Sequence, residues 1–134
     1  MERRAIVETI FEDGWGAERF DSIETALAEF RFNVAGTART MTVDDLRSVV
    51  RSWRVGFPDL RFEIHLVVET GPDIAVHATL HGRQLGIWRD VPPTGRRIEV
   101  EHVFVFRFVD DRVTEVWEVL DREALERQLT DRTT

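Results

Sequence analysis

Cysteine, lysine and tyrosine are missing from the 134 residues, and each absence removes a class of chemistry. Without cysteine there is no thiolate nucleophile and no cysteine-bound zinc. Without lysine there is no Schiff base and no P-loop, and without tyrosine there is no phenol to stabilise an oxyanion. The serines, Ser22, Ser48 and Ser52, lie outside any Gly-x-Ser-x-Gly motif. Catalysis is therefore left to His, Asp, Glu, Arg, Asn, Thr and Trp.

The acidic balance of the chain narrows the range of its partners. The formal net charge is −7 at pH 7, so we expect no basic surface for nucleic acid or for an anionic membrane. No apolar run is long enough to span a bilayer, and acidic residues early in the chain make its start unlike a signal peptide. With 43% hydrophobic residues and no cysteine, the sequence predicts one cytoplasmic domain over residues 1–134, loose only at Thr130 to Thr134.

The first part of the chain has the apolar spacing of helices. A helix is predicted over residues 2–13, and Gly14 and Gly16 should end it. A second apolar stripe follows over residues 20–30, and then a short extended piece over residues 31–35. Two amphipathic segments are thus expected before any sheet.

A third helix and a run of strands are predicted after these segments. Thr42, followed by two aspartates, indicates a capped helix start, and Pro58 should end that helix. Alternating apolar and polar residues then predict strands over residues 61–69, 74–81, 97–109 and 112–120. A short helix opens at Asp121. Helices first and a strand meander second predict an α+β fold.

A histidine and a carboxylate are expected on one face of this sheet. A two-residue loop at Asp110–Asp111 would place His102 diagonally across from Asp121, on an apolar face that also carries Phe104 and Trp117. Such a pair could be tuned for proton transfer near neutral pH. A three-residue loop would move these side chains to opposite faces.

Both members of the pair also have a purely structural interpretation. Asp121 stands just before a short helix, where aspartate is a favoured N-cap, and this role is compatible with catalysis. His102 could be a hydrogen-bonded core histidine. The other histidines, His65, His77 and His81, could meet on the polar face of a hairpin, but their spacing matches no metal motif, so no metal site is predicted.

Aromatic and basic side chains could bind a flat, acidic ligand. Trp53, Trp88 and Trp117 could stack on an aromatic ring, although core packing is the alternative for Trp53 and Trp117. Trp88 lies in a long connection over residues 86–95, a place where functional lids occur. An acidic group could be bound by arginines in and around this connection, for which solvation is the alternative: Arg83, Arg89 and Arg96.

Four segments together resemble the SnoaL-like polyketide cyclase family of the nuclear transport factor 2-like superfamily: Phe57–Leu60, Gly82–Gly86, Pro92–Arg96 and Trp117–Asp121. The resemblance covers nearly the whole chain. It implies an α+β cone in which a curved, mostly antiparallel sheet wraps around N-terminal helices and encloses a pocket. It also implies a homodimer, a small apolar or aromatic polyketide-like ligand, and no metal or organic cofactor.

The family's cyclases suggest roles for individual residues. An aspartate at the position of Asp121 would act as general acid/base in an intramolecular aldol condensation, with His102 donating to the developing oxyanion. The substrate-binding residues would be Trp53, Phe57, Gln84, Trp88, Phe104 and Trp117.

One departure from the pattern of the family's cyclases matters for the proposed chemistry. Gln84 stands where members often have histidine; it can hydrogen-bond a carbonyl but cannot shuttle a proton. Polyketide hydroxylation and non-catalytic binding of a small apolar ligand remain the alternatives to ring closure.

Overall fold

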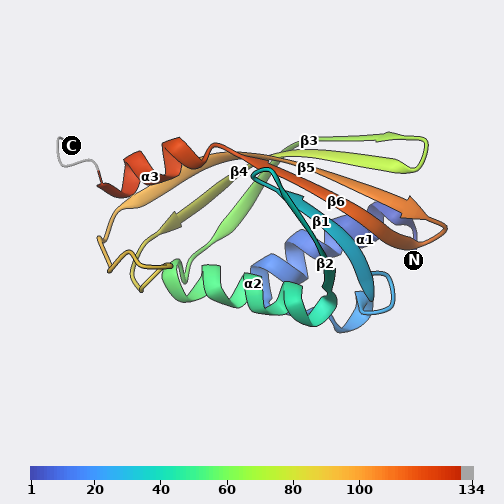
Figure 1. Cartoon of the computed structure of the whole chain (residues 1–134), viewed down its shortest axis with the longest axis horizontal. Coiled ribbons are helices and arrows are strands. Elements are labelled where there is room, and N and C mark those ends of the chain that lie inside the picture. Colours follow the sequence, from blue (N-terminus) through green and yellow to red (C-terminus); the bar gives the residue numbers. More distant parts are fainter. Residues whose placement is uncertain (131–134) are drawn as a thin grey trace.

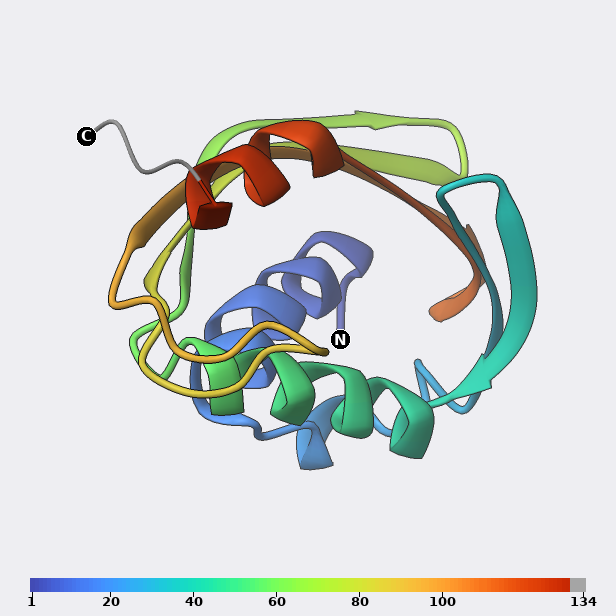
Figure 2. The same cartoon turned by 60° about the vertical axis from the view of Figure 1, so that its left-hand side comes forward.

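The computed structural model describes residues 1–130 and shows helices on the concave side of a curved sheet (Figures 1 and 2). The helices are α1 (Arg3–Thr9), a π-helical turn η1 (Ile10–Trp15), a short 3-10 turn η2 (Asp21–Ile23), α2 (Val43–Gly56) and α3 (Arg122–Thr130). The strands are β1 (Glu29–Val34), β2 (Thr37–Thr42), β3 (Arg61–Thr70), β4 (Asp73–Arg83), β5 (Arg97–Val109) and β6 (Arg112–Leu120). No helix among residues 1–130 has both the length and the apolar character to cross a membrane.

The sheet is mostly antiparallel, with the order β2-β1-β6-β5-β4-β3. Only β1 and β6 run parallel. Figure 2 shows the sheet arching over α1 and α2, while α3 lies at one end of the arch. The predicted α+β arrangement, with N-terminal helices on a curved sheet, is confirmed.

Helix α2 begins as the sequence predicts. The Thr42 side chain accepts a hydrogen bond from the Asp45 N–H (3.2 Å), and the Asp45 carboxylate accepts one from the Thr42 N–H (2.9 Å). This reciprocal capping box satisfies two amide groups that the helix itself leaves unpaired. The cap therefore defines the residue at which α2 begins.

Two predictions about the first part of the chain are wrong. Gly14 does not end the first helix, which continues as η1 and a further turn to Ala17; a Cβ at Gly14 would lie 2.5 Å from the Phe20 ring, so this glycine serves close packing. The apolar side chains of the stripe over residues 20–30 are buried, but the segment forms η2, turns and the start of β1. Strand β2, which no local sequence pattern predicted, is mostly polar and is exposed except at Met41.

The pairing of β5 with β6 differs from the predicted register. Val109 pairs with Arg112, as a two-residue loop requires, but Thr114 is an extra residue beside Arg107, and from there the register shifts by one. His102 therefore faces Leu120 and Phe104 faces Glu118. Since side chains alternate along a strand, this bulge exchanges the two faces of β6.

Each face of the sheet can be followed across the strands. On the inner face, Val76, Phe104, Glu118 and Val34 lie side by side on β4, β5, β6 and β1. Val76 and Phe104 are buried, so Glu118 is a carboxylate in an apolar row.

Candidate active site

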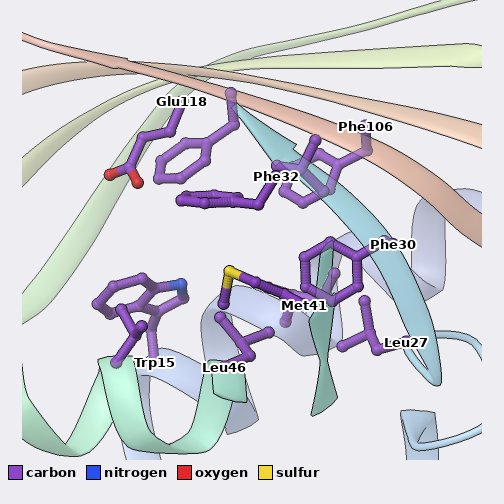
Figure 3. A pocket seen from close by; sticks show the side chains of 12 residues that line it. Trp15, Leu27, Phe30, Phe32, Met41, Leu46, Phe106 and Glu118 are labelled. Carbon is purple, nitrogen blue, oxygen red and sulfur yellow. The ribbon is translucent and has the colours of Figure 1, made fainter. Parts of the chain in front are cut away.

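An apolar cavity lies between the inner face of the sheet and the helices (Figure 3). Its volume is about 30 Å³, which is enough for water but far too small for a multi-ring molecule. Its walls are almost entirely aliphatic and aromatic: Ile10, Trp15, Leu27, Phe30, Phe32, Met41, Leu46, Val49, Phe104, Phe106, Val116 and Glu118. Glu118 is the one ionisable side chain that lines it.

Glu118 is held beside the buried imidazole of His102. The His102 Nε2 and Glu118 Oε2 atoms lie 3.1 Å apart; the His102 side chain is 1% exposed and that of Glu118 is 10% exposed. Phe62 packs edge-on against the His102 ring and Phe104 stacks parallel to it. The imidazole is therefore fixed in position, and its Nε2 atom points at the carboxylate.

The position of one proton in this pair follows from the backbone. His102 Nδ1 lies 3.2 Å from the Val100 carbonyl oxygen, which can only accept, so Nδ1 carries a hydrogen. Any further proton is shared between Nε2 and the Glu118 carboxyl group. The pair can thus exist as imidazolium with carboxylate or as imidazole with carboxylic acid, and this is the property a general acid/base requires.

Trp15 brings a second polar group to the cavity. The π-helical turn η1 carries this residue, and Figure 3 shows its indole nitrogen on the cavity side. The Nε1–H of Trp15 has no hydrogen-bond partner among residues 1–130. Every buried side-chain nitrogen or oxygen in that part of the chain has a partner, so the Trp15 nitrogen is not buried. Because Trp15 lines the cavity, its N–H is accessible from there. It is a free donor that faces the same space as Glu118.

A second pocket opens outward from the cavity and shares Phe32, Val49 and Glu118 with it. This outer pocket has a volume of about 150 Å³. Its remaining walls come from several elements: Val34, Arg39, Trp53, Trp88, Arg89, Leu120, Arg122 and Leu125. Glu118 stands at the boundary between the two spaces, so a ligand in the outer pocket can reach its carboxylate.

Three of the predicted substrate-binding residues line these pockets. Phe104 forms a wall of the cavity, while Trp53 and Trp88 form a wall of the outer pocket with ring centroids 5.0 Å apart. Phe57 packs beside both tryptophans but is fully buried and lines neither space. It supports the aromatic wall from behind.

Gln84 organises the connection over residues 84–96 and does not face either pocket. Its Nε2 donates to the carbonyl oxygens of Gly86 and Val91, and its Oε1 accepts from the Thr94 hydroxyl. All its side-chain groups are used inside the loop and it is completely buried. Its expected contact with a substrate carbonyl is not available in this arrangement.

The bulge also removes Asp121 and Trp117 from the places predicted for them. Asp121 is exposed; its Oδ1 accepts from the Ala124 N–H (2.9 Å) and caps α3. Trp117 lies on the outer face, half-buried, with the Arg107 guanidinium 5.0 Å above its ring. The predicted contact between His102 and Asp121 is wrong, and Glu118 stands beside His102 in place of Asp121.

The residues that the sequence did not indicate as functional were missed for three different reasons. Glu118 was hidden by the bulge at Thr114, which no local sequence feature signals. Trp15 was hidden because Gly14 and Gly16 suggested a helix end. Arg39 lies on a strand that had no apolar alternation.

The histidines of the sheet's outer side each contact a nearby polar side chain. His65 Nε2 lies 2.7 Å from the Thr79 hydroxyl, and His81 Nε2 lies 2.8 Å from Glu63, whose pKa is lowered by this contact. His77 contacts Glu101. Within residues 1–130 no group of three or more His, Asp or Glu side chains could hold a metal ion.

Comparisons with known proteins agree with this architecture. Nogalonic acid methyl ester cyclase of Streptomyces nogalater is 33% identical over 73 residues, which is 54% of each chain, so the chain spans about half the length of this relative. A structure described as a SnoaL-like polyketide cyclase, from Jannaschia sp. CCS1, has 25% identity and a TM-score of 0.84 over 96% of this chain and 92% of its own.

A further solved structure shares the fold alone. AclR of Streptomyces galilaeus, described as a hydroxylase, has 22% identity and a TM-score of 0.81, covering 98% of this chain and 83% of its own. The sequence pattern of the SnoaL-like polyketide cyclases matches residues 5–129. With the predicted nuclear transport factor 2-like fold confirmed, the chain belongs to the SnoaL-like polyketide cyclase family.

Proposed function

We propose that this protein is a cofactor-independent enzyme of aromatic polyketide biosynthesis that closes a ring by intramolecular aldol condensation. The observation that carries the proposal is the Glu118 carboxylate, 3.1 Å from His102 and bordering both pockets. The named cyclase activity of the S. nogalater relative supports the reaction class.

The reaction needs one base, one acid and an enclosed site. The Glu118 carboxylate removes a proton from the carbon next to a substrate carbonyl, which gives an enolate. The enolate carbon attacks a second carbonyl of the same molecule, and the resulting alkoxide takes a proton back from Glu118. Every bond formed lies within the substrate, so its mass is unchanged. The apolar walls limit competing water and hold the reacting carbons close together.

His102 and Trp15 have different parts in this proposal. His102 lines neither pocket, so it acts through Glu118: it orients the carboxylate and can hold the proton that the pair shares. Trp15 presents its free N–H to the cavity and is placed to donate to the enolate oxygen. The predicted oxyanion donor, His102, is thus replaced by Trp15. Asp121 serves as the cap of α3.

The substrate need not enter the inner cavity completely. A flat ring system can lie against Trp53 and Trp88 in the outer pocket, while its reacting edge reaches Glu118. The small inner cavity then accommodates only the carbonyl end.

Product mass tests the proposed reaction. Anthracycline-type intermediates are incubated with the wild type and with Glu118→Gln, and the products are analysed by mass spectrometry and chromatography. A rearranged product of unchanged mass, absent with the variant, is the expected result. Gain of one oxygen would assign hydroxylation, and unaltered substrates with both proteins would favour a binding module.

The outer face of the sheet supports a second proposal, that the chain forms a homodimer. Leu66, His77, Val103 and Val119 form a continuous row across β3, β4, β5 and β6. Leu66 and Val119 are 57% and 64% exposed, and Val68 adds a further exposed apolar side chain. A two-fold contact between two such faces would bury this patch.

Light scattering after size exclusion tests the assembly. We expect a dimer for the wild type and a monomer for Leu66→Glu. The control is Val55→Glu, which places the same charge on an equally exposed site of α2. A monomeric wild type, or a dimeric Leu66→Glu protein, would contradict the proposed interface.

A further inference from the structure

Three arginines converge on the outer pocket from separate parts of the chain. Arg39 comes from β2, Arg89 from the tip of the connection over residues 84–96, and Arg122 from the start of α3. Arg39 and Arg89 also line the wider cleft outside it, with Asp45, Ser48 and Ser52. The entrance to Glu118 is therefore basic, in a chain whose net charge is −7.

These three guanidinium groups are not neutralised by the protein. Among residues 1–130, no carboxylate lies within 4.0 Å of any of them, and none donates a side-chain hydrogen bond. By contrast, Arg47 is paired with Asp44 and Arg107 with Asp73. One acid, Glu118, lines the outer pocket at its inner end, while Asp45, which accepts the Thr42 N–H, lines only the wider cleft outside it. Three cations thus face one shared pocket with their donors unused.

The position of Arg89 is specified by the backbone. Trp88 and Val91 exchange two hydrogen bonds, Trp88 N–H to the Val91 oxygen and Val91 N–H to the Trp88 oxygen, so Arg89 lies at the tip of a two-residue turn. Its φ is +52°, in the left-handed region that favours glycine. Its guanidinium lies 4.9 Å from the Trp88 ring centre, over the aromatic wall. Arg89 thus has a strained backbone conformation, and its charge lies beside the pocket.

We propose that Arg39, Arg89 and Arg122 bind a carboxylate carried by the aromatic substrate, so that the protein acts on a free acid and discriminates against its ester. This inference rests on the proposed function, because it takes the outer pocket as the substrate site. The acid group lies at the entrance, the rings lie against Trp53 and Trp88, and the reacting edge points to Glu118. The S. nogalater relative, in contrast, is named for a methyl ester.

The geometry gives each group a separate task. Guanidinium groups bind carboxylates with two parallel N–H donors, and binding at the entrance keeps the substrate's charge away from the carboxylate of Glu118. An ester has the same shape but lacks the charge, so it loses these charge-assisted hydrogen bonds. A methyl ester should therefore bind about tenfold more weakly than the acid, because one charge-assisted hydrogen bond is worth about that factor.

Titration calorimetry with two flat probes tests the inference without any turnover. The probes are anthraquinone-2-carboxylate and its methyl ester, and the proteins are the wild type and Arg39→Gln/Arg122→Gln. The wild type is expected to bind the acid about tenfold more tightly than the ester, and added salt should weaken only acid binding. The double variant should lose this preference and keep its affinity for the ester.

A matched control removes the same charge elsewhere. Arg19→Gln/Arg112→Gln changes two exposed arginines that line neither the cavity nor the pockets around it, and it should keep the preference for the acid. Equal affinity for acid and ester in the wild type would overturn the inference, as would no binding of the acid or a preference that survives in the double variant. Ring closure is measured separately by product mass, so either proposal can fail alone.

Discussion

The Nε2 atom of His102 lies 3.1 Å from Oε2 of Glu118, although the cross-strand partner of His102 is Leu120. The two side chains meet diagonally on the inner face of the sheet, because Glu118 follows the bulge at Thr114. One extra residue in β6 thus decides which carboxylate borders the pockets. The proposed chemistry depends on this displacement.

Asp121 should matter for stability and not for turnover. Its carboxylate caps α3 through the Ala124 N–H, and asparagine caps helices about as well as aspartate. We therefore expect Asp121→Ala to lower the free energy of unfolding by about 0.5–2 kcal/mol, with Asp121→Asn close to the wild type. Urea denaturation measures this directly, and equal stability of all three proteins would show that the cap contributes nothing.

Trp15→Phe separates the indole N–H from the ring that carries it. Phenylalanine keeps an aromatic ring beside Phe62, which packs edge-on against Trp15, but it has no donor for the enolate oxygen. We expect kcat to fall about 100-fold, the order found when one oxyanion donor is removed. The thermal midpoint should change much less than for Trp15→Ala. An unchanged kcat would remove Trp15 from the mechanism.

Arg89→Gly and Arg89→Gln remove the same guanidinium but differ in backbone strain. The φ of +52° suits glycine and costs other residues about 1 kcal/mol. Arg89→Gly should therefore be more stable than Arg89→Gln by about 1 kcal/mol, while both bind the acid probe more weakly. Chemical denaturation of the two variants is the measurement. An Arg89→Gly protein that is less stable than Arg89→Gln would contradict the claim that the backbone is strained at residue 89.

Asp73 and Arg107 give the stability a defined pH dependence. Their two hydrogen bonds, 2.9 and 3.1 Å, lower the pKa of Asp73 below its ordinary value of 3.8. A group whose pKa is lowered by folding stabilises the protein above its unfolded pKa, and this contribution is lost as the pH falls through the folded pKa. Asp73→Asn should thus be less stable than the wild type at pH 7, and the difference should shrink below about pH 4.

Denaturation at a series of pH values checks this expectation. A difference between wild type and Asp73→Asn that stays constant down to the lowest pH would mean that the ion pair does not contribute. Arg107→Gln should show the same loss of pH dependence, because it removes the partner that lowers the Asp73 pKa.

Much of the fold could be predicted from local patterns. The capping box at Thr42, the alternation along β4 and β5 and the loop at Asp110–Asp111 are signals that a few neighbouring residues carry, and the structure shows each of them. The candidate site could not be predicted from local patterns alone. The face on which a residue of β6 lies depends on how many residues separate it from the loop between β5 and β6. The bulge at Thr114 changes that count by one and leaves no mark in the sequence.

Other errors came from residues with two possible roles. Gly14 was interpreted as a helix end, but it is required by its contact with Phe20, which only the tertiary structure reveals. Gln84 matched a family position for substrate contact, while its hydrogen bonds are all used within its own loop. A polar residue type indicates what a side chain can bind, and only the fold decides which partner it meets.

The measurement that tests the central claim most directly is kcat for Glu118→Gln beside Asp121→Asn, on the polyketide intermediate that the wild type cyclises. Each variant replaces a carboxylate with an amide of nearly the same shape. If Glu118 is the general acid/base, its variant should lose about 100- to 10,000-fold in kcat while Asp121→Asn stays close to the wild type. An active Glu118→Gln protein together with an inactive Asp121→Asn protein would contradict the account.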